Sequence, residues 1–153
     1  MMRTFVEALI FDLDGTLIDS RRDIVQGVNH ALEALGCKAL PAETVSEYVG
    51  DGVKNLLGRC LAHYSREHLA DEGVLHFQEH YGRHLLDNTR LYPSALEVLE
   101  GFRSKRMALI SNKPENFTLQ ILAALKIDKY FDHALGGDSL PVKKPDPLPL
   151  LNV

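Results

Sequence analysis

The sequence has 153 residues, of which 45% are hydrophobic and 25% charged, with a formal net charge of −4 at pH 7. This balance is typical of a globular chain with one ordinary core, and it indicates no general affinity for nucleic acid or an anionic membrane. No apolar run is long enough to span a membrane and no signal-peptide pattern is present, so we expect a cytoplasmic protein. Cys37 and Cys60 lie in helical patterns and are expected to be packing residues rather than a disulfide or metal ligands.

A mostly apolar run from Phe5 to Phe11 opens the chain and has the length of a buried central strand. It ends in Asp12 and Asp14, with Gly15 and Thr16 behind them. Residues two apart in an extended backbone point to one side, and ligands of parallel sheets bind outside the carboxyl ends of the strands. Because charges beside an apolar core are costly unless paired or metal-bound, the pattern predicts a cation and anion site here. A plain Asp-Gly turn is the alternative interpretation.

Helical periodicity then continues to about residue 87. Ser20 and Asp23 resemble a capping box, and the apolar stripe behind them predicts a helix that stops at Gly36. Further helices are expected after Pro41, after the break Gly50-Asp51-Gly52, and from about Arg66 to Leu86. We therefore expect an all-helical unit, residues 18–87, inserted after the first strand.

Helices and strands alternate in the remainder of the chain. The expected elements are a helix from Pro93 with Leu96, Leu99 and Phe102 on one face, a buried strand at Met107–Ile110, a helix from Pro114, and a strand at Phe131–Leu135. Such alternation predicts a parallel sheet with helices on its faces. The expected fold is α/β, with a Rossmann-like three-layer core made of residues 1–17 and 88–153 and a helical cap made of residues 18–87.

Polar residues follow the second expected strand as they follow the first. Ser111 stands at its end, before a helix start whose amides can bind phosphate. Asn112 and Lys113 come next, and Lys144 precedes a proline in the tail. Taken alone, such a serine is most often a helix cap and such lysines are ordinarily solvated.

Together these residues resemble the haloacid-dehalogenase-like phosphohydrolases. Asp12-Leu13-Asp14-Gly15-Thr16 matches the first motif of that family, Ser111 the second and Lys144 the third. The resemblance implies that Asp12 attacks phosphorus, that Asp14 serves as general acid and base, and that Ser111 and Lys144 hold the phosphoryl group. It also implies a Mg²⁺ cofactor bound by Asp12 and the backbone carbonyl of Asp14.

The presence of Asp14 favours a phosphatase over a dehalogenase. The strings Leu17-Ile18-Asp19-Ser20, Val49-Gly50-Asp51-Gly52-Val53 and Gly136-Gly137-Asp138-Ser139 look like those of bacterial phosphoglycolate phosphatases. This resemblance implies a small phosphorylated metabolite, 2-phosphoglycolate, as substrate; phosphosugar mutases and pyrophosphatases share the cap type. Asn112 and Lys113 resemble residues that the subgroup uses near the substrate. Gly50, Gly52 and Lys54 are candidates for holding a substrate carboxylate, with a plain helix–helix turn as the alternative.

The fourth motif of the family, which supplies a further magnesium ligand, is not recognised in the sequence. Asp138 imitates it but precedes Lys144, so we do not assign it that role. The alternative to an active phosphatase is therefore a truncated chain that binds phosphate or a partner without turnover. In the family the strand after the third motif lies beside the first strand. Without it we expect the strand Phe5–Phe11 to be an edge, which favours self-association or a complementing segment.

Three histidines, His76, His80 and His84, recur at four-residue spacing and so share one helix face. This spacing can recruit a transition metal. Because no acid or cysteine completes a recognisable motif, a solvated face is the favoured interpretation.

Overall fold

The structure, a computed structural model, describes residues 6–153. The chain divides into two compact units, one made of the segment up to Ile18 together with Leu91–Val153, and the other of Asp19–Arg90. Across the described residues, none of the helices has both the length and the apolar character needed to cross a membrane.

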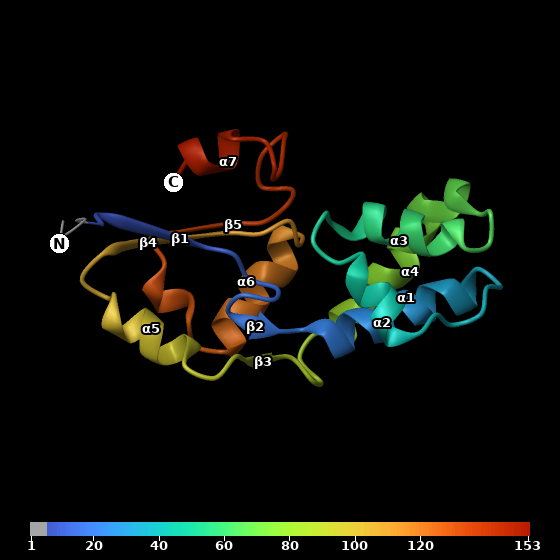
Figure 1. The fold of residues 1–153 in the computed structure, drawn as a ribbon, viewed down its shortest axis with the longest axis horizontal. Coiled ribbons are helices and arrows are strands. Elements are labelled where there is room, and N and C mark those ends of the chain that lie inside the picture. Colours follow the sequence, from blue (N-terminus) through green and yellow to red (C-terminus); the bar gives the residue numbers. More distant parts are fainter. Residues whose placement is uncertain (1–5) are drawn as a thin grey trace. The chain divides into compact units, whose positions relative to one another are not determined.

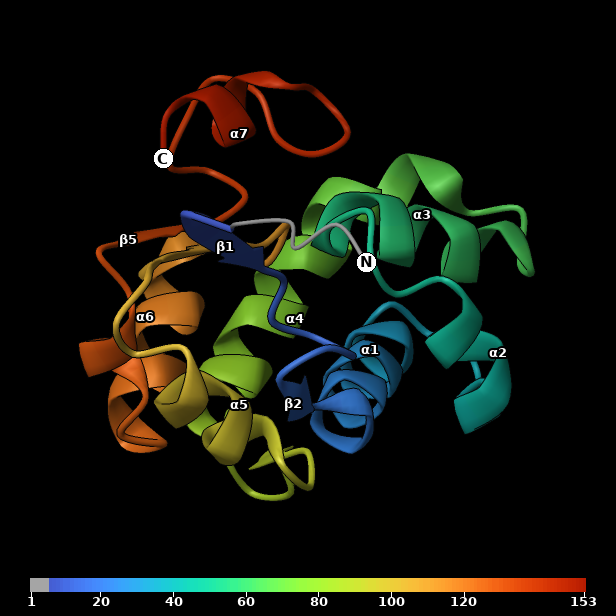
Figure 2. The same cartoon turned by 60° about the vertical axis from the view of Figure 1, so that its left-hand side comes forward.

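A three-stranded sheet organises the first unit. Its strands are β1 (Ala8–Phe11), β4 (Arg106–Ile110) and β5 (His133–Leu135), in the order β1-β4-β5. Both pairings are parallel, with Leu9 opposite Met107 and Leu109 opposite Ala134. Helices α5 (Ala95–Gly101) and α6 (Glu115–Ala124) lie on one face of this sheet, and the short α7 (Leu148–Leu151) lies on the other (Figures 1 and 2). The predicted α/β class with a parallel sheet is confirmed.

The first strand does not have the buried central place that its apolar composition predicts. β1 pairs only with β4 among the described strands, and Ile10 keeps 46% of its surface exposed. The strand is also shorter than predicted: it begins at Ala8, and Phe5 lies outside the described residues. Among the described strands, β1 therefore lies at an edge of the sheet. Such an edge presents unpaired backbone donors and acceptors.

The central strand β4 carries the core of the first unit. Its last four residues are all buried, and Leu109 has no exposed surface. Helix α6, on one face of the sheet (Figure 1), buries Phe117, Ile121 and Leu122. Helix α5 differs from the prediction: it buries Leu99 through the face it shares with Ala95, while Leu96 and Phe102 stay exposed. The helix ends at Gly101, so Phe102 lies beyond it, and the buried face is the one that Ala95 and Leu99 share at a spacing of four residues.

Helices dominate the second unit, as expected. They are α1 (Arg21–Ala34), α2 (Ala42–Glu47), α3 (Val53–Ala62), the 3₁₀ turn η1 (Glu67–Leu69) and α4 (Ala70–Arg83). Helices α1 and α4 pack closely at Gly27. A Cβ at this position would lie only 2.9 Å from the Phe77 ring, so the approach requires a residue without a side chain. The chain enters and leaves this unit through β2 (Ile18–Asp19) and β3 (Arg90–Leu91), which pair as a two-stranded sheet.

The predicted capping box at the start of α1 is wrong. The side chain of Ser20 makes no capping hydrogen bond to the helix. The carboxylate of Asp23, only 1% exposed, instead accepts hydrogen bonds from the backbone and side chain of both Asn88 and Thr89, at 2.7–3.0 Å. Burial raises the pKa of Asp23, but the hydrogen bonds from Asn88 and Thr89 outweigh it and hold that pKa below its ordinary value. Asp23 therefore fastens the end of the unit to its beginning.

The second unit also contains two buried cysteines and a part-exposed stack of histidine rings. Cys37 and Cys60 are free and buried, as predicted, and burial raises the pKa of Cys60 to about 11. The ring of His80 stacks on His30 of α1 at a centroid distance of 4.3 Å and on His84 at 4.4 Å.

Candidate active site

The two carboxylates of the first motif follow β1 within a tight turn. Leu13, fully buried between them, anchors the turn, and its carbonyl accepts hydrogen bonds from the amides of Thr16, Leu17 and Ile18. Gly15 has a positive φ of 79°, a conformation that residues with a Cβ rarely adopt. The turn leaves Asp12 and Asp14 part-exposed at the carboxyl end of the strand, where parallel sheets bind ligands.

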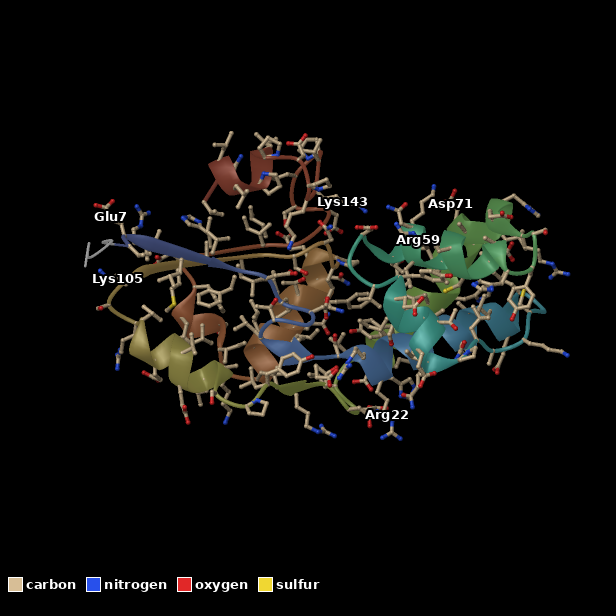
Figure 3. The ribbon with its side chains drawn as sticks, viewed as in Figure 1. Glu7, Arg22, Arg59, Asp71, Lys105 and Lys143 are labelled. Atoms are coloured by element: carbon tan, nitrogen blue, oxygen red, sulfur yellow. The ribbon has the colours of Figure 1, made fainter. Side chains whose placement is uncertain are left out.

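Asp12 forms an ion pair with Lys144. The Lys144 Nζ lies 2.9 Å from Asp12 Oδ1 and also donates a 2.8 Å hydrogen bond to the carbonyl of Ile110, the last residue of β4. The second Asp12 contact is from the Leu13 amide to Oδ1, at 2.8 Å. The neighbouring Lys143, labelled in Figure 3, is not the partner of Asp12 in this pair. Lys144 therefore places a fixed positive charge between the ends of β1 and β4.

Asp14 forms the second ion pair of the site, with Lys113. The Lys113 Nζ lies 3.3 Å from Asp14 Oδ1, and the lysine side chain is only 5% exposed. A lysine this buried beside a carboxylate loses little attraction to solvent screening. The backbone of Lys113 is also fixed, because its amide donates to Ser111 Oγ at 3.1 Å. Ser111 is buried directly after β4.

Asn112 connects the two lysines. It stands between Ser111 and Lys113, and its Nδ2 donates to the backbone carbonyl of Lys144 at 3.1 Å. The segments after β1 and β4 and the tail segment around Lys144 thus form one hydrogen-bonded group. Two carboxylates, two ammonium groups and a hydroxyl gather there, which is a composition suited to a phosphate and a cation.

The residues present fit a magnesium ion. Carboxylate oxygens are its preferred ligands, and Mg²⁺ is commonly held by only one or two carboxylates, with water and substrate phosphate completing its shell. The Asp12 carboxylate and the backbone carbonyl oxygen of Asp14 offer two oxygen ligands of this kind. In the part of the chain that the structure describes, no cluster of three or more His, Cys, Asp or Glu side chains has metal-binding geometry.

The candidate residues Gly50, Gly52 and Lys54 belong to the second unit. Gly52 precedes α3 with a positive φ of 90°, so this position needs a residue without a Cβ. Lys54 forms an exposed 2.6 Å ion pair with Asp71 of α4, which is labelled in Figure 3. A carboxylate ligand would therefore compete with Asp71 for this lysine.

The histidine face predicted on the helix Arg66–Leu86 is present on α4, but its rings do not form a metal centre among the described residues. His80 stacks between two other imidazoles, and His84 Nδ1 lies 2.8 Å from Asp87 Oδ2. Parallel stacked rings direct their nitrogens away from a common point.

Comparison with known proteins identifies the family. Residues 9–153 match the haloacid dehalogenase-like hydrolases. The chain belongs to this family.

Relatives and solved structures agree with that assignment. The chain is 39% identical to the phosphoglycolate phosphatase of Nitrosospira multiformis, over 96% of its own length and 67% of the relative's. It is 43% identical to the phosphoglycolate phosphatase of Neisseria meningitidis, over 95% of this chain and 64% of that one. The chain therefore spans about two thirds of these relatives.

A crystal structure of a predicted phosphoglycolate phosphatase from Haemophilus somnus superimposes with a TM-score of 0.88 at 32% identity, covering 95% of this chain and 69% of that one. A haloacid dehalogenase-like hydrolase from Bacteroides fragilis superimposes with a TM-score of 0.86 at 26% identity, covering 95% and 70% of the two chains. The described fold is thus that of this hydrolase family.

Two features of the site were not assigned from sequence. The carbonyl of Ile110 as a partner of Lys144 has no sequence signal, because any residue carries a carbonyl. The close packing of Gly136 and Gly137 against the Ser111–Lys113 segment does have one, since paired glycines after a strand often mark a close backbone approach.

Proposed function

We propose that this hydrolase-family chain is a magnesium-dependent phosphatase that cleaves a small phosphomonoester, 2-phosphoglycolate. The observation that carries the proposal is the gathering of Asp12, Asp14, Ser111, Lys113 and Lys144 at the carboxyl ends of β1 and β4. The substrate rests on the phosphoglycolate phosphatases to which the chain is similar.

Asp12 is the nucleophile in this proposal. One of its oxygens attacks phosphorus and the bond to the substrate's bridging oxygen breaks, leaving an aspartyl phosphate. Asp14 donates a proton to the departing oxygen and then takes one from the water that hydrolyses the acyl phosphate. A Mg²⁺ ion held by Asp12 and the Asp14 carbonyl would neutralise phosphate charge.

Lys144 counters the repulsion between an anionic Asp12 and an anionic phosphate. Its ammonium already lies 2.9 Å from the nucleophile, and it is held there by the Ile110 carbonyl. Ser111 donates its hydroxyl to the phosphoryl oxygens. Lys113 holds the carboxyl of Asp14 near the leaving group.

The second unit serves as a cap in this proposal. Its glycine loop at Gly50 and Gly52 offers backbone amides to the substrate carboxylate, and Lys54 exchanges its partner Asp71 for that carboxylate. Closure of such a cap would exclude water from the reaction.

Phosphate release from a substrate panel tests the proposal. We expect 2-phosphoglycolate to be hydrolysed faster than a hexose 1-phosphate or pyrophosphate, with activity lost on removal of Mg²⁺. Asp12→Asn should lower kcat by about 10³-fold or more, as removal of a covalent nucleophile does. Asp128→Asn, a change at an acid away from the site, should leave activity unchanged. An Asp12→Asn protein with wild-type activity would overturn the assigned mechanism.

A second candidate is phosphate binding without turnover, with β1 pairing to a second copy or a complementing segment. It is favoured by the exposed edge of β1 and by the absence of a third metal-binding acid beside Asp12 and Asp14 among the described residues. Inorganic phosphate that binds the wild-type protein without hydrolysis of any panel member would select this candidate.

A further inference from the structure

The segment that follows β5 runs beside the segment that follows β4 and is hydrogen-bonded to it at successive positions. The Ser111 amide donates to the Leu135 carbonyl at 2.9 Å, and the Gly137 amide donates to the Lys113 carbonyl at 2.7 Å. The same Lys113 carbonyl accepts a 3.3 Å hydrogen bond from Thr118 Oγ1. The backbone that carries Ser111 and Lys113 is thus fixed from outside its own loop.

Asp138 and Ser139 extend this contact to the start of α6. The helix begins at Glu115 after Pro114, whose side chain makes no cap. Asp138 Oδ1 accepts the Glu115 amide at 2.7 Å, and so it caps a helix from 23 residues further along the chain. Ser139 Oγ donates to Glu115 Oε1 at 2.6 Å and accepts the Gly136 amide at 2.7 Å.

The two glycines allow this close approach. A Cβ built on Gly136 would lie 2.3 Å from Glu115 Cα, and one on Gly137 would lie 2.4 Å from the carbonyl oxygen of Asn112. Both contacts are with backbone, which cannot rotate away as a side chain can. Neither glycine has a positive φ, so lack of space alone excludes a side chain here.

We propose that residues 136–139 form a clamp that positions Ser111, Asn112 and Lys113 for the reaction. The catalytic benefit of this clamp rests on the proposed function. The contacts between residues 136–139 and the segment Ser111–Lys113 do not depend on it. Its effect reaches both carboxylates: Lys113 contacts Asp14, and Asn112 holds the carbonyl of Lys144, whose ammonium contacts Asp12. Residues 136–139 act through the Ser111–Lys113 segment and the start of α6, so we assign them a positioning role.

Gly137→Ala is the first test, with Gly101→Ala as its matched control. Gly101 lies at the end of α5 in the same unit, has no positive φ, and a Cβ there would meet no atom within 4 Å. We expect Gly137→Ala to speed amide exchange at Ser111–Lys113 and to weaken binding of inorganic phosphate by about tenfold or more. Where the protein turns over 2-phosphoglycolate, kcat should fall by about 10- to 100-fold with less change in KM. Gly101→Ala should match wild type in all three.

Asp138→Ala and Asp138→Asn form the second test, which does not depend on steric strain. Asn caps helices about as well as Asp, whereas Ala does not. We therefore expect Asn to retain wild-type exchange rates at Lys113 and wild-type phosphate affinity, and Ala to lose both. If Asp138 were a magnesium ligand instead, Asn would fail as Ala does, and the loss would appear in the dependence on Mg²⁺ concentration.

Amide exchange at residues 111–113 tests, independently of activity, whether residues 136–139 hold this segment in place. Unchanged exchange at residues 111–113 in folded Gly137→Ala and Asp138→Ala proteins would overturn the clamp, whatever the activity. A wild-type protein that neither binds phosphate nor hydrolyses the panel would defeat the proposed function, and faster exchange in the variants would still support the clamp. If Gly137→Ala does not fold, the comparison of Asp138→Ala with Asp138→Asn provides the same test.

Discussion

Replacing Asp23 by Asn should destabilise the second unit strongly. The change keeps the shape of the side chain but exchanges one acceptor oxygen for an amide group that donates. Asp23 receives hydrogen bonds from four donors of Asn88 and Thr89, which are divided between its two oxygens. Whichever way the new amide turns, backbone or side-chain donors at one of these positions lose their acceptor.

The size of the effect follows from burial. A buried donor left without an acceptor costs about 1–3 kcal/mol, and hydrogen bonds to a charged group contribute about 1.5–3 kcal/mol each without strict additivity. Thr89 is only 4% exposed, so water cannot replace the lost acceptor. We expect a loss of about 3 kcal/mol, which for a domain of 60–100 residues lowers Tm by roughly 12–24 °C.

The loss should also depend on pH. The pKa of Asp23 is lowered in the folded protein, so its ionised form adds stability above the unfolded pKa of about 3.9. That stability disappears as the pH falls through the folded pKa. The gap between wild type and Asp23→Asn should therefore be full at pH 7 and shrink in the window below about pH 4.

Urea unfolding followed by far-UV circular dichroism at pH 7 and pH 3 measures this gap. Asp19→Asn is the matched control, because Asp19 begins the same helical unit but forms an exposed pair with Arg21 at 2.7 Å. Surface pairs of this kind contribute about 0–1 kcal/mol. Equal losses in the two variants, or a gap that is the same at both pH values, would refute the reasoning.

Three further predictions concern other parts of the molecule. Burial and the neighbouring His30 and His84 lower the pKa of His80, so the stability of the fold should fall as the pH drops through about 6.5. In a series of Tm measurements at different pH values, His80→Gln should reduce this fall. The same dependence of Tm on pH in the variant and the wild type would contradict the prediction. Burial raises the pKa of Cys60 to about 11, so iodoacetamide at pH 8 should label it only after urea is added, and rapid labelling of the folded protein would count against that burial. The edge position of β1 should cause self-association, which Ile10→Lys should reduce in size-exclusion with light scattering; a wild-type monomer with strongly protected amides on both sides of β1 would rule this out.

Periodicity and turn residues predicted most elements, because they reflect local physics. The helix stop at Gly36 and the buried strand at Met107–Ile110 follow from backbone freedom and apolar composition, and both are present. The predictions failed where a distant residue decided the outcome. Ser20 and Asp23 have the spacing of a capping box, yet Asn88 and Thr89 offer Asp23 more hydrogen bonds than the first turn of α1 does.

The candidate site could be predicted in part, because its residues follow directly after predicted strands. Motif order indicated that Asp12, Ser111 and Lys144 come together, since parallel strands end at one edge. It gave no indication that Lys113 contacts Asp14, because a lysine in a loop after a strand is ordinarily solvated. Apolar composition likewise overestimated the burial of β1, since composition records what a strand can bury and not how many neighbours it has.

The bond between Asp23 and residues 88–89 also bears on how the first unit can assemble. Ala8 pairs with Arg106, so the sheet must close a loop that contains the whole second unit. The entropy of closing a loop rises with the logarithm of its length. Once Asp23 and the pairing of β2 with β3 join the ends of that unit, the chain between β1 and β4 behaves as a loop several times shorter. A fourfold shortening lowers the closure cost by about 1 kcal/mol. The insertion therefore need not slow formation of the sheet that carries the nucleophile, provided that the helices fold first.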